Sequence, residues 1–295
     1  MKRKLVQQGA STLMISLPSK WAKQFNLKKG DEVDINEKDK LLIIAKESTS
    51  GDKKTAKIDV SSWHPLINRL LLSYFLKGYD EVEIHYSNHE QVKRFQKDIL
   101  TTELLGWEVI KQSPGVLVVK DLTAGEMGNT DDVLKRLFFM LDNMCGELIE
   151  SLEKKHDAGV IESDKVINRF VYYCLRLLNK KGYKEYDKTS QVYSIITLVE
   201  ETGDLFKDIA KKKFKAMKDD LAALKDIKNS FALFKEAFFN FTREVEIKLA
   251  HNYEKIKKEI HPKSEIDSYL HAINGNIIRM NNELMMMNVG SISVH

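Results

Sequence analysis

The sequence is poor in cysteine: its 295 residues include only Cys145 and Cys174, each within an apolar helical pattern. Structural disulfides are therefore not expected, and both side chains are predicted to be small core residues. No uncharged apolar run approaches the ~18 residues that a membrane-spanning helix needs. The basic residues at positions 2–4 are not followed by the apolar segment of a signal peptide. We expect a cytoplasmic protein that does not insert into a membrane.

Motifs of catalytic sites are also missing from the sequence. It has no glycine-rich phosphate loop, no nucleophile elbow and no zinc-type cysteine cluster. A content of 43% hydrophobic and 31% charged residues is that of an ordinary globular protein, and the length allows two or three domains. The sequence therefore predicts a multidomain protein that is not an enzyme.

Acidic residues are absent from the first 30 positions, which hold seven Lys and Arg residues. Since the whole chain has a formal net charge of +4, the remaining 265 residues have a net charge of −3. Concentrated positive charge speeds the encounter with a polyanion and neutralises its phosphates. The asymmetry favours an N-terminal segment that meets a nucleic acid. The alternative is a solvated terminus without such a partner.

Alternation of apolar and polar residues predicts a small β domain at residues 1–47. Pro18 suits the first turn of a short helix, in which Trp21 and Phe25 lie one turn apart. Asn26 is expected to end this helix in a left-handed conformation. The predicted elements are strands at 4–8, 12–17, 33–35 and 41–45, turns at 9–11 and 37–40, and the helix between them. The pattern is ββαββ.

A module of fewer than ~50 residues with few large apolar side chains cannot bury enough surface by itself. Two copies that interleave their hairpins would form the missing core, so we expect an obligate homodimer. A β-ribbon can enter the major groove of DNA, where Gln and Arg side chains read base edges. Lys and Arg residues beside it neutralise phosphates. The module is therefore predicted to bind double-stranded DNA.

Residues 1–47 resemble the AbrB/MazE/SpoVT swapped-hairpin family in the string Arg3-Lys4-Leu5…Gly9…Ser11…Ile15-Ser16-Leu17-Pro18…Trp21…Leu27-Lys28-Lys29-Gly30-Asp31-Glu32-Val33. The resemblance implies a domain-swapped dimer whose basic face grips DNA, as in transition-state regulators and antitoxins. Matched by position, the resemblance implies DNA contacts from Arg3, Lys4, Ser11, Thr12 and Lys20. Charge and β-ribbon chemistry add Lys2 and Gln7. The candidate DNA-binding residues are Lys2, Arg3, Lys4, Gln7, Ser11, Thr12 and Lys20. The alternative is a dimerisation hairpin that does not bind DNA.

The chain continues with a polar segment at 48–54 that is typical of a linker, and then with a mixed α/β pattern at 55–123. The predicted elements are strands at 56–60, 82–84, 107–112 and 116–120 and helices at 65–76 and 90–105. No pocket motif occurs in this stretch. We interpret it as a small α/β domain that serves as a scaffold or a sensing domain.

Residues 128–290 lack strand signals and show long amphipathic segments. Short connections between long helices imply antiparallel packing. The predicted helices span 130–155, 163–181, 187–216, 221–250, a short piece at 252–260 and 263–289, with breaks at Gly159, Gly182 and His261-Pro262. The expected fold class is multidomain α+β: an N-terminal swapped-hairpin β domain, a small central α/β domain and a C-terminal all-α antiparallel helical bundle.

Two pairs of polar residues in the bundle have the spacing that places both side chains on one helix face. Glu200 and Asp204 form the first pair, and Asp164 and Asn168 the second. Carboxylates at this spacing can share a hard or borderline cation. Charged pairs four residues apart also occur on most surface helices, so spacing alone favours the simpler interpretation. Gly203 within a helix costs about 1 kcal/mol relative to Ala, which favours close packing there.

The run from Val199 to Asp204, followed by Ile209-Ala210, resembles the Glu-x-x-x-Asp helix of the PhoU family, and residues 164–169 resemble its other acidic helix. The resemblance implies a helical regulator of phosphate uptake with a divalent or iron-type metal ion at the acidic helices. The candidate metal ligands are Glu200, Asp204, Asp164 and Asn168. This sequence departs from the family, because Asn168 replaces an acid and residues 270–275 lack carboxylates. A second metal cluster is therefore not expected.

These features lead to one main hypothesis and two alternatives. The main hypothesis is a homodimeric DNA-binding transcription regulator in which the bundle senses phosphate supply, as in prokaryotic and especially archaeal proteins that join these two domains. The first alternative is a signalling adaptor that binds no DNA and acts on a phosphate transporter or its sensor kinase. The second is an antitoxin, against which the long ordered bundle argues. The operator, the sensed ligand and the direction of regulation do not follow from the sequence.

Overall fold

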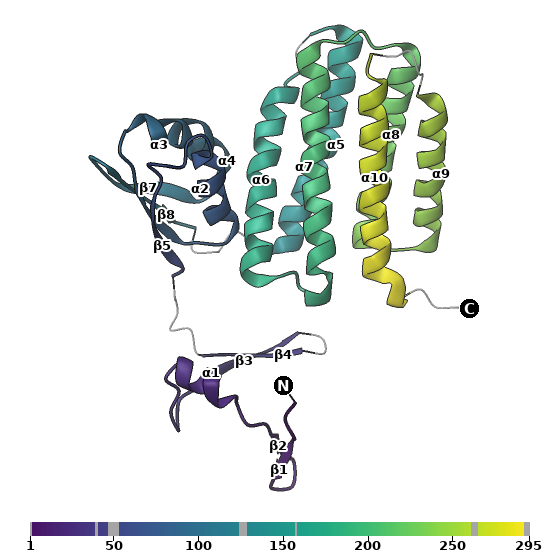
Figure 1. The fold of residues 1–295 in the computed structure, drawn as a ribbon. Coiled ribbons are helices and arrows are strands. Elements are labelled where there is room, and N and C mark those ends of the chain that lie inside the picture. Colours follow the sequence, from purple (N-terminus) through teal and green to yellow (C-terminus); the bar gives the residue numbers. More distant parts are fainter. Residues whose placement is uncertain are drawn as a thin grey trace. The chain divides into compact units, whose positions relative to one another are not determined.

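The computed structural model describes residues 2–38, 41–46, 53–123, 129–156, 158–260 and 265–291 (Figure 1). The chain divides into two compact units, Met1–Asp52 and Lys53–His295. The second unit has two hydrophobic cores, one in a sheet domain and one in a helical bundle. The fold is therefore multidomain α+β with an N-terminal hairpin domain, a small sheet domain and a helical C-terminal region, which confirms the predicted class. In the described ranges, no helix combines the length and apolarity needed to cross a membrane.

The first unit consists of two hairpins joined by a short helix. Strands β1 (Val6–Gln8) and β2 (Thr12–Met14) pair in an antiparallel manner, and so do β3 (Val33–Lys38) and β4 (Leu41–Lys46). Helix α1 (Ser19–Gln24) begins after Pro18, and Asn26 has a left-handed φ of 51°. The order ββαββ is the predicted one. The first two strands are shorter than predicted, since pairing ends at Met14. Asp39 and Lys40 of the predicted second turn and the linker residues 47–52 lie outside the described residues.

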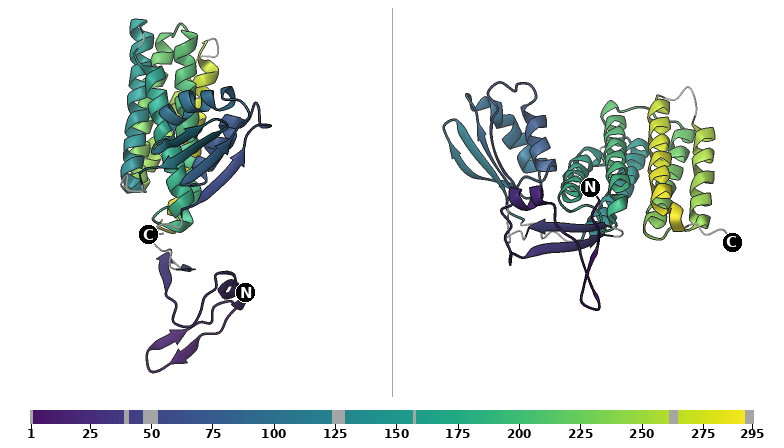
Figure 2. Two further views of the ribbon diagram at one scale, coloured as in Figure 1. Left: turned by 90° about the vertical axis from the view of Figure 1, so that its left-hand side faces the viewer. Right: turned by 60° about the horizontal axis from the view of Figure 1, so that its bottom comes forward.

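The sheet domain has the strand order β5-β6-β8-β7, in which β5 and β6 are parallel and the other neighbours are antiparallel. The helical stretches over residues 67–76 and 90–103 lie on one face of the sheet (Figure 2). The elements are β5 (Thr55–Asp59), α2 (Ile67–Leu76), β6 (Glu81–His85), α3 (Glu90–Arg94), the π-helix η1 (Phe95–Leu100), α4 (Thr101–Glu103), β7 (Trp107–Ser113) and β8 (Val116–Asp121). Phe75 and Trp107 pack edge to face in its core, with ring centroids 5.4 Å apart. The helix predicted at 90–105 is present as three consecutive segments.

The described part of the bundle contains six long helices, which in chain order form two successive sets of three (Figure 1). They are α5 (Thr130–Lys154), α6 (Val160–Lys181), α7 (Thr189–Lys212), α8 (Lys218–Phe239), α9 (Arg243–Glu259) and α10 (Asp267–Asn288), with 3-10 turns at η2 (Tyr186–Lys188) and η3 (Val289–Ser291). Gly159 and Gly182 have positive φ angles at the breaks on either side of α6, a conformation that favours glycine. Cys145 and Cys174 are buried and free, as predicted, and burial raises the pKa of the Cys174 thiol to about 12.

One predicted helix boundary in the bundle is wrong. A single helix over 221–250 and a separate short piece over 252–260 were expected, whereas the chain breaks between α8 and α9, at residues 240–242. Asn240 leaves the helical conformation, and the Thr242 side chain accepts a hydrogen bond from the Val245 N–H, which caps the new helix. The apolar residues around this cap continue the helical pattern and hide the break. His261, Pro262 and Lys263 lie outside the described residues.

The sheet domain and the bundle are in direct contact within the second unit. Helices α2 and α4 of the sheet domain pack against α6 of the bundle. Arg176 of α6 donates hydrogen bonds to the carbonyl oxygens of Phe75 and Tyr79 at 2.6 and 2.8 Å, and Asn179 donates to that of Leu76 at 2.9 Å. These bonds add donors from α6 to carbonyls at the end of α2 and in the loop that follows it.

Candidate nucleic-acid interface and acidic cluster

The predicted DNA-binding residues lie on exposed parts of the first unit. Lys2, Arg3 and Lys4 directly precede β1, and Lys20 lies on α1. The remaining candidates follow the first hairpin: Gln7 on β1, Ser11 in the turn and Thr12 at the start of β2. All seven side chains are solvent-exposed in the single chain. Charged and polar groups are thus available at one end of the chain for a large anionic partner.

The register of the first hairpin places two of the candidate DNA-binding residues on opposite faces of the ribbon. Gln7 pairs with Leu13, while Gln8 pairs with Thr12. Directly opposed residues project from the same face of a two-stranded ribbon, and successive residues project from opposite faces. Gln7 and Thr12 therefore cannot both point into one groove. Gln8 shares the face of Thr12 and was missed as a candidate, although the alternation along the strand would have revealed it.

The described part of the first unit forms no hydrophobic core: none of its described side chains is buried, and Leu13 is 64% exposed in the single chain. The exposed large apolar side chains among these residues are Leu5, Val6, Leu13, Met14, Ile15, Phe25, Ile35, Leu42 and Ile43. Soluble monomers rarely expose large contiguous apolar patches, and such patches mark interaction surfaces. These side chains are therefore a candidate interaction surface.

The comparison with known protein families bears on this unit. Residues 6–52 match the family model described as antidote-toxin recognition MazE, bacterial antitoxin. The hairpin unit is thus similar to a MazE-type domain, as its sequence predicts, and the match covers the first unit only. No curated protein and no solved structure was found to match the chain. The similarity of the helical bundle to the PhoU family stays a prediction, with which a large helical C-terminal region is consistent.

Two of the predicted metal ligands in the bundle accept hydrogen bonds from a lysine. Asp164 of α6 and Asp204 of α7 both accept hydrogen bonds from the ammonium group of Lys207, with 3.0 Å between Lys207 Nζ and Asp164 Oδ2. Asp164 is nearly buried, with 5% of its side chain exposed, and Lys207 is 17% exposed. The second oxygen of Asp164 and the Oδ1 atom of Asn168 are buried without a hydrogen-bond partner. An internal cation therefore holds two of the four predicted ligands together.

Burial and mutual repulsion raise the pKa values of several carboxylates around Lys207. Burial raises the pKa of Asp164, and the nearby Asp204 adds to the effect while Lys207 opposes it. Burial likewise raises the pKa of Glu200, with a further contribution from Asp204. Glu103, at the end of α4 in the sheet domain, shows the same shift through burial and through Asp164. The four carboxylates Glu103, Asp164, Glu200 and Asp204, together with Lys207, are called the acidic cluster below.

The geometry of the acidic cluster can be tested against the metal ion that the PhoU resemblance implies. A cation shared by Asp164 and Asp204 would need oxygen atoms of both carboxylates. The ammonium of Lys207 already lies at bonding distance from both. The residues therefore do not fit a metal ion as long as Lys207 keeps this position.

Sequence reasoning missed both Lys207 and Glu103 as members of the cluster. Lys207 stands three residues after Asp204, so helical spacing places it beside that carboxylate and could have revealed it. Glu103 lies 61 positions before Asp164 in a different domain, and no local pattern connects the two. Glu162, which stands near Asp164 in the sequence, is an exposed residue in the first turn of α6.

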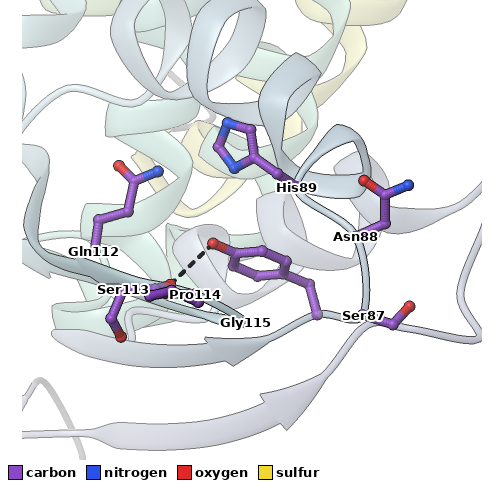
Figure 3. Close-up of a pocket in the computed structure, with 8 residues that line it drawn as sticks. Ser87, Asn88, His89, Gln112, Ser113, Pro114 and Gly115 are labelled. Carbon is purple, nitrogen blue, oxygen red and sulfur yellow. Dashed lines mark hydrogen bonds between the residues drawn. The ribbon is translucent and has the colours of Figure 1, made fainter.

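A shallow pocket lies in the sheet domain between the loop after β6 and the β7–β8 hairpin (Figure 3). Its volume is about 690 Å³, and residues 86–89 and 112–115 line it. The Tyr86 hydroxyl donates a hydrogen bond to the Ser113 carbonyl at 3.2 Å and ties the two walls together. The lining residues include no Lys, Arg, Asp or Glu. The pocket therefore lacks the charge that a phosphate-binding site would use.

Proposed function

We propose that the protein is a DNA-binding regulator that acts as a homodimer through its first unit. One observation carries the proposal: the unit concentrates exposed basic side chains and leaves its apolar side chains without a core. A second copy would bury the apolar residues and double the basic surface. The two-fold symmetry of such a dimer suits a palindromic or pseudo-palindromic DNA site.

The ribbon face of the first hairpin decides which side chains read bases in this proposal. Gln8 and Thr12 share one face, and their hydrogen-bonding groups can contact base edges if that face enters the major groove. Arg3 and Lys4 precede the ribbon and supply phosphate contacts. If Gln7 reads the bases instead, Leu13 shares its face and contributes only apolar contact. Exchanging Gln7 and Gln8 separately for Ala distinguishes these two orientations.

The helical bundle is the regulatory part in this proposal, and the regulated process is phosphate uptake. The support for phosphate is the resemblance of residues 164–169 and 199–204 to the acidic helices of PhoU proteins, together with the two sets of three helices. A change in the bundle or in the sheet domain would re-space the two hairpin units and alter their fit to DNA half-sites. Genome-wide DNA occupancy at high and low phosphate tests this part, since occupancy that ignores phosphate supply would contradict it.

The DNA-binding step is tested by titrating labelled genomic fragments with the full chain at several salt concentrations. We expect the Arg3→Ala/Lys4→Ala variant to bind roughly tenfold more weakly and with a smaller salt slope, because each phosphate contact contributes about 0.9 to that slope. The Lys28→Ala/Lys29→Ala variant removes the same charge from the turn that follows α1 in the sequence, and it serves as the matched control. Absence of binding at low salt, or equal losses in both variants, would contradict the proposal.

An antitoxin is the second candidate, which the description of the matched family favours. In that case a toxin partner would cover part of the exposed apolar surface, and growth inhibition by that toxin would be relieved by this chain. A signalling adaptor that binds no DNA is the third candidate. It would keep its regulatory effect in the Arg3→Ala/Lys4→Ala variant, whereas a DNA-binding regulator would lose it.

A further inference from the structure

Lys207 occupies the place of a cation between two carboxylates of different helices. Its ammonium contacts Asp164, near the start of α6, and Asp204, which like Lys207 lies toward the end of α7. A buried carboxylate such as that of Asp164 is stable in its charged form only with a charged or hydrogen-bonding partner. In this structure the partner of Asp164 is Lys207.

The sheet domain contributes a further carboxylate near these residues. Glu103 ends α4, which packs on α6, and burial raises its pKa, with Asp164 and Asp204 adding to the shift and Lys207 opposing it. Further charges act on these carboxylates: Lys211 on Asp164, Asp98 on Glu103 and Glu201 on Glu200. Asp164 and Asp204 repel each other unless a cation lies between them, and the ammonium of Lys207 contacts both.

Gly203 of α7 lies beside the Asp164 carboxylate. A Cβ atom at Gly203 would lie 3.9 Å from the unpartnered Oδ1 atom of Asp164 and 3.8 Å from Ile167 and Met144. The backbone of α7 therefore packs close to this carboxylate. The ammonium of Lys207, which comes from one turn further along α7, fills the cation position from inside the chain.

We infer that the ammonium group of Lys207 is the resident cation between Asp164 and Asp204, and that it joins α6 to α7 in place of a metal ion. A tethered ammonium loses less translational freedom than a free ion and does not depend on metal supply. The contact between α6 and α7 is then insensitive to divalent cations in the native protein. The inference concerns the second unit alone, so the result of its test does not depend on DNA binding by the first unit.

The test measures thermal unfolding of the full chain in a chelator and in millimolar Mn²⁺, Mg²⁺ or Zn²⁺. We expect the native Tm to be equal in all of these conditions, and the purified protein to contain no stoichiometric metal by elemental analysis. The Lys207→Met variant is expected to lose roughly 5 °C in the chelator and to regain part of the loss in Mn²⁺. The Lys165→Met variant, which removes an exposed charge of α6, is the matched control and keeps the native behaviour.

Two further variants keep the test decisive if Lys207→Met unfolds. Lys207→Arg keeps a cation and is expected to stay indifferent to metal, while Lys207→Met/Asp204→Asn removes one charge of each sign and is expected to regain stability. The inference is overturned if Mn²⁺ or another tested ion raises the native Tm and Asp204→Asn abolishes that rise. It is equally overturned if Lys207→Met and Lys165→Met have the same Tm in the chelator.

Discussion

Arg176 and Asp121 form a buried ion pair, with 2.7 Å between Arg176 Nη2 and Asp121 Oδ2, although they lie 55 positions apart. Only 2% of the arginine side chain and 6% of the aspartate side chain are exposed. Burial alone would raise the pKa of Asp121, but hydrogen bonds from Thr123 and Arg176 outweigh it and hold that pKa below its usual range. The pair joins the end of β8 in the sheet domain to α6 in the bundle. It therefore fixes the two domains to each other.

Removal of the arginine should weaken this junction. We expect Arg176→Met to lower the free energy of unfolding by about 3 kcal/mol, because the buried carboxylate of Asp121 loses its cationic partner and two backbone carbonyls lose one donor each. Urea denaturation measures the loss. The control Lys165→Met changes an exposed residue of the same helix and should cost almost nothing. A loss for Arg176→Met as small as that of the control would contradict the role of the pair.

Glu246 on α9 predicts a pH dependence of stability. Glu246 is 9% exposed, and neither of its carboxylate oxygens has a hydrogen-bond partner. Burial raises the pKa of Glu246, and Asn281 opposes this shift. A raised pKa in the folded state stabilises the fold below the ordinary value of 4.5, and this contribution is lost as the pH rises through the folded pKa. Glu246→Gln should thus gain about 1 kcal/mol at neutral pH.

The comparison of the two pH ranges isolates the effect of Glu246. At about pH 4 the native residue is protonated in both states, so Glu246→Gln and the native chain should have nearly equal free energies of unfolding. Guanidine denaturation at both pH values measures the difference. The exposed Glu244 on the same helix supplies the control Glu244→Gln. A gain for Glu246→Gln that is independent of pH would show that packing, and not charge, is responsible.

Gly203 in α7 is expected to tolerate alanine. The added Cβ would meet its three nearest atoms at 3.8–3.9 Å, which is ordinary van der Waals contact. Since Ala stabilises a helix interior by about 1 kcal/mol relative to Gly, Gly203→Ala should raise the free energy of unfolding by about that amount. Gly275→Ala in α10, where no atom lies within 4 Å of the added Cβ, is the control and should gain as much. Destabilisation of Gly203→Ala alone, measured by urea unfolding, would indicate tighter packing than the distances give.

The exposed apolar side chains of the first unit predict self-association. Leu13→Glu places a charge on a side chain that would be buried between two copies, so the dimer should dissociate roughly tenfold more readily or more. Sedimentation velocity over a range of concentrations measures this change. Gln24→Glu on α1 adds the same charge at an exposed polar position and should leave the dimer intact. A native chain that sediments as a monomer at all concentrations would contradict the dimer.

Much of the architecture follows from local sequence signals. The ββαββ order of the first unit, the left-handed Asn26 and the breaks at Gly159 and Gly182 were all predictable, since each depends on a few neighbouring residues. The break at 240–242 was not found, because aromatic residues continue the helical pattern across a polar cap. The alternation of side chains along the strands could also have shown that Gln7 and Thr12 project from opposite faces, but the choice of candidate residues did not use it.

The sequence by itself thus determined the basic, acid-free first 30 residues, the fold class and the helical faces, because charge and periodicity are properties of short segments. Only the tertiary structure decided which distant charges meet. Asp121 meets Arg176 across the domain contact, and Asp164 meets Lys207 between α6 and α7, through packing of elements that are far apart in the chain. Local patterns cannot encode such meetings, because the strength of each charge interaction depends on burial that the whole fold creates.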